Sequence, residues 1–168
     1  MALLEAQATM EDKTMINETT TSKLNDMRLA AMAHTYRTQL SDASFQGLSF
    51  EERFGLIVDI EWARRKNNKL ARLIKNADFK FSQACIEDLE YHTDRKLDKT
   101  QLIRLSSCQY IAEKHNLIIM GASGNGKSYM GCAFGVAACR NYYTVKYVRL
   151  PDLLDELAVA RGEGIFKK

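Results

Sequence analysis

The stretch that decides the fold is GASGNGKS, residues 121–128 of a chain of 168 residues. It matches the pattern G-x-x-x-x-G-K-[ST] through four residues, Gly121, Gly126, Lys127 and Ser128. A loop of this kind must follow a strand and open a helix. The apolar run NLIIM (116–120) precedes it, and KSYMGCAFGVAACR (127–140) follows it with helical character. This order predicts a phosphate-binding P-loop (Walker A motif) rather than a glycine-rich turn that binds nothing.

Each residue type in the loop has a chemical reason. The glycines let the backbone turn tightly and approach oxygen atoms without a Cβ in the way. Backbone N–H groups of the loop and of the following helix then surround the phosphates. Lys127 places an ammonium on the β- and γ-phosphates, and Ser128 offers a hydroxyl to Mg²⁺. The predicted ligands are ATP and Mg²⁺, held by Gly121, Ala122, Ser123, Gly124, Asn125, Gly126, Lys127 and Ser128.

The segments around the loop predict an α/β domain over residues 98–168. Residues 127–140 are apolar on almost every side, as a helix buried against a sheet should be. Gly131 and Gly135 indicate close packing of this helix on the sheet. TVKYVRL alternates like a second strand over 144–149, and Pro151 is typical of the first turn of a further helix. We therefore expect the start of a parallel-sheet P-loop domain.

Residues 21–97 predict an all-helical module. SKLNDMRLAAMAHTYRTQL (22–40) has helical spacing of its apolar residues. Ser49 and Glu52 form an S-x-x-E capping box that opens a longer helix. Residues 78–98 are irregular, and Asp98 with Gln101 indicates another helix start. Residues 1–20 are polar, so we expect a flexible leader, within which Met15 is an alternative start.

A basic run lies in the long predicted helix. Between Arg64 and Lys75 the sequence has six basic residues and no acidic one. One interpretation is a solvated helix face, since helical spacing does not place all six on one side. The other is a contact with the phosphate backbone of nucleic acid. The candidate nucleic-acid contacts are Arg64, Arg65, Lys66, Lys69 and Arg72.

Composition excludes several classes of protein. Hydrophobic residues make up 46% of the chain and the net charge is only +3, an ordinary globular balance. The cysteines form no C-x-x-C pair, and no Cys/His cluster has the spacing of a zinc site. These cysteines and the scattered histidines are expected to be structural, which fits a reducing cytoplasmic setting. We expect no signal peptide, and no apolar run approaches the ~18 residues of a membrane span.

The sequence resembles the IstB-like family, helper ATPases of insertion-sequence transposases. Members are AAA+ proteins similar to helicase loaders of the DnaC type, so the resemblance implies an AAA+-like P-loop domain over residues 98–168. The resemblance extends from about residue 15 to the end. Its helical part rests on MRLAAMAHTY, EERFGLIVDIEWARRKNNKLARLIKNA and IEDLEYHTDRKLDKTQLIRLSSCQYI, and its α/β part on NLIIMGASGNGKSYMGCAFGVAAC and VKYVRLPDLLDELAVARGEG. It implies ATP-dependent assembly on double-stranded DNA, homo-oligomers, delivery of a transposase, and a helical module that contacts transposase or DNA.

The sequence also departs from the family pattern. Ser128 stands where members often have Thr, which keeps the hydroxyl, and Tyr110 stands where many have Trp, which keeps an aromatic ring. The resemblance implies a Walker B acidic pair, a sensor residue and an arginine finger beyond Lys168. Asp152, Asp155 and Glu156 lie on a predicted helix and are not assigned to Walker B. We therefore expect no catalytic residues, impaired ATP hydrolysis, and partly exposed apolar faces over 127–140 and 152–160.

Three functions stay open from the sequence. The first is ATP binding in support of a transposase. The second is a replication protein of the helicase-loader type, which shares the same P-loop. The third is a non-catalytic module that binds DNA or transposase, with a vestigial P-loop. The helical segments favour the first function, and whether the shortening relative to the family arose by gene truncation, frameshift or choice of fragment stays open.

Overall fold

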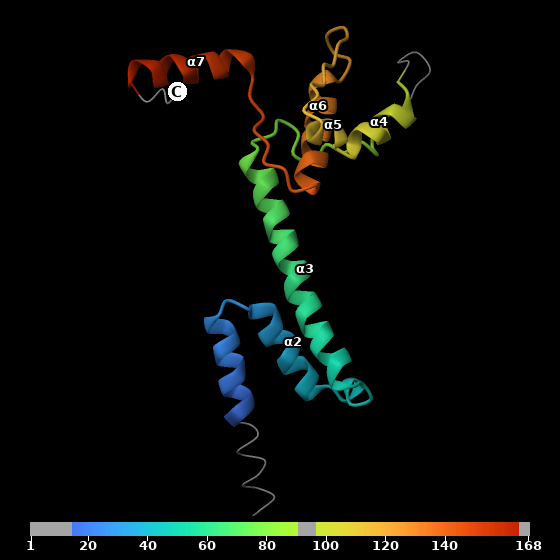
Figure 1. The fold of residues 1–168 in the computed structure, drawn as a ribbon, viewed down its shortest axis with the longest axis vertical. Helices are drawn as coiled ribbons and strands as arrows, with labels where there is room; N and C mark the ends of the chain where they lie inside the picture. Colours follow the sequence, from blue (N-terminus) through green and yellow to red (C-terminus); the bar gives the residue numbers. More distant parts are fainter. Residues whose placement is uncertain (1–14, 91–96, 165–168) are drawn as a thin grey trace, which may run out of the picture. The chain divides into compact units, whose positions relative to one another are not determined.

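A computed structural model describes residues 15–90 and 97–164. The chain forms two compact units: unit 1 ends at Asn68 and unit 2 begins at Lys69. Helix α3 (Phe50–Asn76) runs through this division (Figure 1). The predicted domain boundary at 97/98 stays a prediction. Residues 1–14 of the predicted leader, and His92, lie outside the described residues.

The described part of unit 1 begins with a helix that covers residues 15–26, and the predicted leader over 1–20 stays a prediction. This helix ends at Arg28, which has a left-handed backbone with φ of 60°. The N–H groups of Arg28 and Leu29 each donate at 2.8 Å to carbonyls near the helix end. Such a pair is a Schellman cap, which ends a helix. Helix α2 (Ala30–Ser41) follows directly, so the prediction of one helix over 22–40 is wrong.

The entry to α3 confirms the predicted capping box. The 3-10 helix η1 (Ala43–Phe45) separates α2 from α3. The Ser49 N–H then donates to the Glu52 carboxylate at 2.8 Å, and the Glu52 N–H donates to Ser49 Oγ at 3.2 Å. Each side chain thus satisfies a backbone N–H that has no partner within the helix. A local sequence signal accounts for where this helix of 27 residues begins.

The described residues of unit 2 form four further helices: α4 (Lys99–Ser106), α5 (Gln109–Ala112), α6 (Lys127–Arg140) and α7 (Leu150–Gly162). Two of the predicted starts are confirmed. The Asp98 carboxylate accepts from the N–H groups of Thr100 at 2.8 Å and Gln101 at 3.3 Å. Pro151 lies in the first turn of α7, where its missing N–H leaves no bond unmade.

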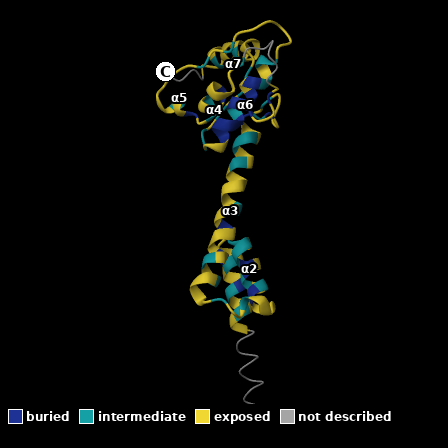
Figure 2. Ribbon diagram, turned by 90° about the vertical axis from the view of Figure 1, so that its right-hand side faces the viewer, coloured by how far each residue is buried: buried dark blue, intermediate teal, exposed yellow. Residues whose placement is uncertain are grey.

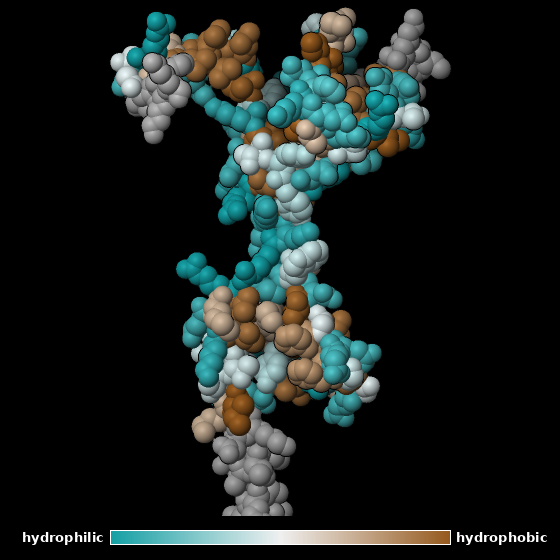
Figure 3. Space-filling model, in the orientation of Figure 1, coloured by the Kyte–Doolittle hydropathy of each residue, from teal (hydrophilic) through white to brown (hydrophobic). Residues whose placement is uncertain are grey.

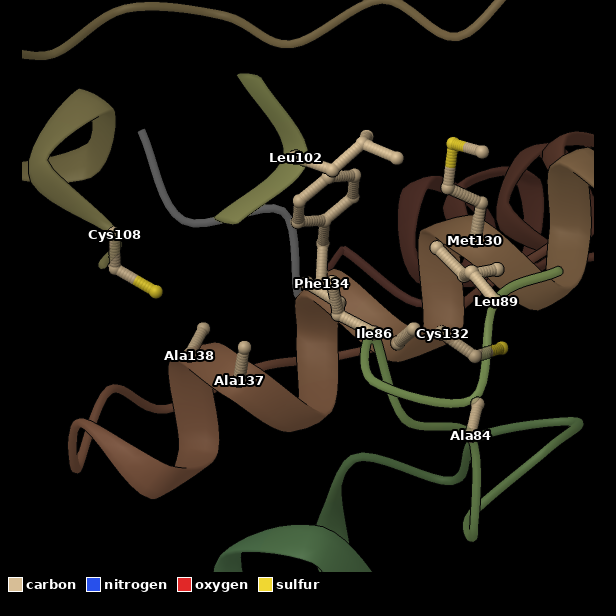
Figure 4. Close-up of a cluster of buried hydrophobic side chains, with 11 residues drawn as sticks. Ala84, Ile86, Leu89, Leu102, Cys108, Met130, Cys132, Phe134, Ala137 and Ala138 are labelled. Carbon is tan, nitrogen blue, oxygen red and sulfur yellow. The ribbon is translucent and has the colours of Figure 1, made fainter. Parts of the chain in front are cut away.

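Helix α6 lies at the centre of unit 2. Eight of its 14 residues are buried: Met130, Cys132, Ala133, Phe134, Val136, Ala137, Ala138 and Cys139. Figure 4 shows the Phe134 ring reaching toward Leu102 of α4. Ala84, Ile86 and Leu89, from the irregular segment before α4, belong to the same cluster. The core of the unit is therefore built from helices and loops around α6, and the expectation that 127–140 is partly exposed is wrong for most of this helix.

The predicted parallel sheet is not confirmed. Residues 116–120 and 144–149 have no regular secondary structure, and the described part of the chain contains no β-strand. A strand exists only when its backbone groups pair with a neighbour in a ladder. Among the described residues, 144–149 make a single backbone hydrogen bond to a distant segment, from the Tyr147 N–H to the Ala77 carbonyl at 2.8 Å, and no ladder. The apolar pattern of these segments is therefore used for packing, because Leu117, Ile119, Val145 and Tyr147 all lie against the core.

The two glycines of α6 differ in their surroundings. A Cβ at Gly135 would come within 2.4 Å of the Phe79 ring, so only glycine allows this approach. A Cβ at Gly131 would meet no heavy atom within 4 Å. Close packing therefore explains Gly135, although its partner is a ring from the segment after α3 and not a sheet. It does not explain Gly131.

Helix α7 has no buried residue, in contrast to α6 (Figure 2). Its leucines Leu150, Leu154 and Leu157 are 67%, 56% and 41% exposed. They share one face with Leu153, at the i, i+3, i+4, i+7 spacing of an apolar stripe. The expectation of an exposed apolar face over 152–160 is confirmed, and this surface is visible in Figure 3.

Candidate nucleotide-binding site

The glycine-rich loop lies between residues 116–120 and α6, as the sequence predicts. Gly124 has a φ of 84° and Gly126 a φ of 77°. Residues other than glycine rarely adopt this left-handed backbone conformation. Gly126 is also the residue before the first turn of α6. The loop conformation therefore favours glycine at Gly126, a fixed position of the motif, and at Gly124, one of its variable positions.

The Lys127 side chain lies back across the loop. Its Nζ donates to the Ala122 carbonyl at 2.6 Å, and the same oxygen accepts from the Asn125 N–H at 3.4 Å. A Cβ at Gly121 would lie 3.8 and 3.9 Å from carbons of the Lys127 stem, which is ordinary van der Waals contact. The ammonium is thus held against the loop backbone, where a bound phosphate would meet it.

The start of α6 adds unsatisfied donors beside this ammonium. Its first backbone bond joins the Met130 N–H to the Gly126 carbonyl at 2.9 Å. The N–H groups of Lys127, Ser128 and Tyr129 come before that bond and have no partner within the helix. They also carry the positive end of the helix dipole. The helix start and the Lys127 ammonium together make a site suited to an anion.

A cavity of about 350 Å³ opens on the loop. Gly121, Asn125 and Lys127 give it a polar side. Leu97, Ile119, Met120 and Met130 give it an apolar side that the sequence analysis did not single out. Three of these four flank the motif directly, so their positions next to 121–128 were the available signal. A pocket with one polar and one apolar side suits a ligand that joins phosphates to an aromatic base.

The predicted Mg²⁺ ligand has a suitable position. Ser128 is exposed in the first turn of α6, directly after Lys127 in the sequence. Its hydroxyl is an oxygen donor, the type of ligand that Mg²⁺ prefers, and Mg²⁺ commonly completes its shell with phosphate oxygens and water. The residues present therefore fit a magnesium ion bound together with phosphates. Among the described residues, no cluster of three His, Cys, Asp or Glu side chains could hold a metal by itself.

The predicted basic run is not a uniform surface. In unit 1, Arg64 and Arg65 bind the carboxylate of Glu61 at 2.7 and 2.8 Å. Both also donate to the Arg28 carbonyl, at 3.3 and 3.5 Å. Two of the predicted nucleic-acid contacts thus take part in joining α3 to the turn between the first two helices of unit 1. The sequence analysis missed this role because Glu61 lies just before the run.

Glu61 is the centre of this group and is only 4% exposed. Its Oε2 accepts from the Ala31 N–H at 3.1 Å, in the first turn of α2. Hydrogen bonds from Arg64, and then from Arg65 and Ala31, lower the pKa of Glu61 to about 2, although burial opposes this shift. The carboxylate is therefore charged at every physiological pH and neutralises part of the run.

The remaining basic residues are exposed on α3. In unit 1, the Lys66 ammonium lies 4.1 Å from the centroid of the Trp62 ring. In unit 2, the Lys69 ammonium lies 5.0 Å from the centroid of the Tyr142 ring. Arg72 and Lys75 are exposed as well. Lysine over an aromatic ring keeps its charge and most of its solvent access, so these positions still present positive charge.

The acidic residues of α7 lie on a helix, as predicted. Glu156 binds Lys146 at 2.6 Å and Asp152 lies 3.9 Å from Arg149. Asp152, Asp155 and Glu156 all face solvent on α7. Among the helices that the structure describes, none is long and apolar enough to cross a membrane.

Comparison with known proteins agrees with the class that the loop defines, a nucleotide-binding protein. The model of the family described as IstB-like ATP binding protein matches residues 22–168. The chain therefore belongs to the family of IstB-like ATP binding proteins.

Two relatives illustrate the similarity. A Pseudomonas fluorescens protein, whose name refers to insertion sequence IS1162 and to ATP binding, is 40% identical over 152 residues, 90% of this chain and 66% of the relative. A Sinorhizobium fredii (strain NBRC 101917 / NGR234) protein, y4pL, whose name also refers to an insertion sequence and to ATP binding, is 38% identical over 154 residues, 92% of this chain and 62% of the relative. The chain thus spans somewhat less than two thirds of the length of these relatives.

Proposed function

We propose that the chain binds ATP with Mg²⁺ through Gly121–Ser128 and acts beside a transposase in the transposition of an insertion sequence. One observation carries the nucleotide part. The Lys127 ammonium is held on the loop at 2.6 Å from the Ala122 carbonyl, next to the N–H groups that open α6. A cation and several N–H donors around one point favour a phosphate group.

The residues of the site have distinct roles in this proposal. On binding, the Lys127 ammonium exchanges the Ala122 carbonyl for phosphate oxygens. The first N–H groups of α6 donate to the same phosphates, and the Ser128 hydroxyl contributes to holding Mg²⁺. The magnesium ion, when bound, neutralises charge on the phosphates. The apolar side of the cavity, with Met120 and Met130, receives the base.

Calorimetric titration of the full chain with ATP and Mg²⁺ tests this site. Loss of a charged hydrogen bond is worth about 1.5–3 kcal/mol, so Lys127→Ala should weaken binding by about 10- to 150-fold. Lys146→Ala removes an equal charge at a position that pairs with Glu156, away from the loop sequence, and serves as the matched control. Equal affinity of both variants and the unchanged chain would remove the P-loop from the proposal.

The transposition role rests on the family and on the names of the relatives. Both relatives are named for insertion sequences, which favours this role over a helicase loader. In the proposed role the chain forms homo-oligomers on double-stranded DNA and brings a transposase to it. Lys66, Lys69 and Arg72 are the main proposed contacts with duplex DNA, because the Glu61 carboxylate neutralises part of the charge of Arg64 and Arg65.

Salt dependence tests the DNA contact. Each phosphate contact contributes about −0.9 to the slope of log affinity against log salt on duplex DNA. The triple variant Lys66→Gln, Lys69→Gln, Arg72→Gln should therefore flatten the slope by about 2 to 3. Lys99→Gln, outside α3, is the control. A slope unchanged in the triple variant would return these residues to a solvated helix face.

A further inference from the structure

The sole tryptophan of the chain lies exposed in unit 1. Trp62 is on α3 and is 59% exposed. Tryptophan usually buries most of its large ring, so a ring this exposed needs a reason. Its neighbour at i−4, Val58, is 39% exposed, so apolar surface continues along the helix beside it.

Two basic residues neighbour this ring on its C-terminal side, and one exposed acid, Asp59, lies at i−3 on its N-terminal side. The Lys66 ammonium lies 4.1 Å from the ring centroid. Arg65, at i+3 from Trp62, has a side chain that is 57% exposed, and its Nε donates to Glu61 at 2.8 Å. Residues three and four positions apart are neighbours on a helix. Glu61 therefore holds one guanidinium at a fixed place next to the exposed ring.

We propose that Trp62, Arg65 and Lys66 form a stacking site for an unpaired base of DNA. The chemistry favours this ligand over an apolar protein helix, because an apolar helix would place Arg65 and Lys66 against uncharged groups. A nucleotide offers a flat base for the ring and a phosphate for the cations. Bases inside an intact duplex expose no face, so the site selects single-stranded or unstacked DNA. This inference rests on the proposed contact of α3 with DNA and adds a second form of DNA, one with an unpaired base, to the duplex proposed above.

The fluorescence of Trp62 reports on this site directly. The chain has one tryptophan, so all tryptophan emission comes from it. Saturating the chain with a single-stranded thymine oligonucleotide should quench this emission, since a base then lies on the Trp62 ring. A duplex of equal length should bind, through the basic residues, with little quenching. Equal quenching by both forms, or quenching by neither, would overturn the stacking site.

Three variants separate stacking from charge. Stacking on an aromatic side chain is worth about 1–3 kcal/mol per base, so Trp62→Leu should weaken single-strand binding about 5- to 150-fold. Trp62→Phe keeps a ring and should retain most of the affinity. For the duplex, Trp62→Leu should change affinity by no more than about twofold, the usual effect of a surface substitution. Lys66→Gln should lower the single-strand salt slope by about 0.7.

The outcomes also separate this inference from the proposed function. If the basic variants weaken DNA binding while Trp62→Leu and Trp62→Phe behave like the unchanged chain on single strands, the DNA contact stands and the stacking site is wrong. If the chain binds neither form of DNA, both are wrong. Circular dichroism of each variant checks that the helices are intact, as expected for an exposed position.

Discussion

The interiors of the two units are built from different kinds of side chain. In the described part of unit 1, the buried polar residues are Thr21, Thr35, Gln39 and Glu61, and the buried apolar ones are Ala33 and Ile57. Unit 2 has the reverse character, because all the buried side chains among its described residues are apolar and most belong to α6 or pack on it. Unit 1 therefore depends on hydrogen-bond geometry and unit 2 on apolar burial.

This difference determines what each unit leaves exposed. Unit 1 keeps large apolar side chains outside, with Phe50 and Phe54 stacked at 5.9 Å and 75% and 51% exposed. They line an apolar groove of about 430 Å³ that also includes Leu40 and Ile57 (Figure 3). Unit 2 buries α6 and leaves the leucine face of α7 open. Both α6 and α7 have apolar sequences, but only α6 is buried by neighbouring segments. The apolar sequence of a helix therefore does not by itself predict whether that helix is buried.

The largest expected effect concerns the core of unit 2. Phe134 is 4% exposed, so Phe134→Ala should lower the free energy of unfolding by about 3–5 kcal/mol. Leu154→Ala on α7 is the matched control, and should stay within about 0.5 kcal/mol, because this leucine is 56% exposed. Urea denaturation followed by circular dichroism measures both. Equal effects of the two variants would contradict the contrast between α6 and α7.

The second effect concerns the close approach of α6 to Phe79, in the segment after α3. Gly135→Ala adds a Cβ that would lie 2.4 Å from the Phe79 ring. This overpacking should destabilise unit 2 by about 1–3 kcal/mol. Gly131→Ala meets open space and should instead stabilise the helix by about 0.5–1 kcal/mol. Thermal denaturation distinguishes the two signs. The same sign for both would mean that the Phe79 contact does not restrict α6.

The third effect tests the polar core of unit 1. Glu61→Gln removes the charge that holds Arg64 and Arg65, and should destabilise unit 1 by about 1–3 kcal/mol. The pKa of Glu61 is lowered to about 2 from an ordinary value of 4.5. Its contribution is therefore complete above pH 4.5 and is lost as the pH falls toward 2. In acid titrations followed by helical signal, Glu61→Gln should lack this component; an unchanged profile would show that Glu61 does not hold unit 1.

Local signals in the sequence predicted local structure well. Residues within one turn predict where three helices start, at Ser49, Asp98 and Pro151. The glycines of the P-loop predict its conformation in the same local way. The helix end at Arg28 was missed because its left-handed residue is not a glycine. The sheet was predicted from two apolar runs, but a strand depends on a distant partner that no local pattern supplies.

The site was predictable in the same uneven way. The motif identified the polar side of the nucleotide pocket, because phosphate chemistry fixes residue types at fixed spacing. Leu97, which completes the apolar side, reaches it from far along the chain. The pairing of Glu61 with Arg64 and Arg65 changes the meaning of the basic run, and it depends on the tertiary contact with Ala31 as well as on helical spacing.

Hydrogen exchange of the full chain, with and without ATP and Mg²⁺, tests most directly the claim that unit 2 carries the nucleotide site. The account predicts slower exchange over Gly121–Ser128 and the first turn of α6, because phosphates engage those N–H groups, and no change over residues 50–68. Lys127→Ala should abolish the protection at the same ATP concentration. Unchanged exchange over Gly121–Ser128 at saturating nucleotide, or protection confined to unit 1, would contradict it.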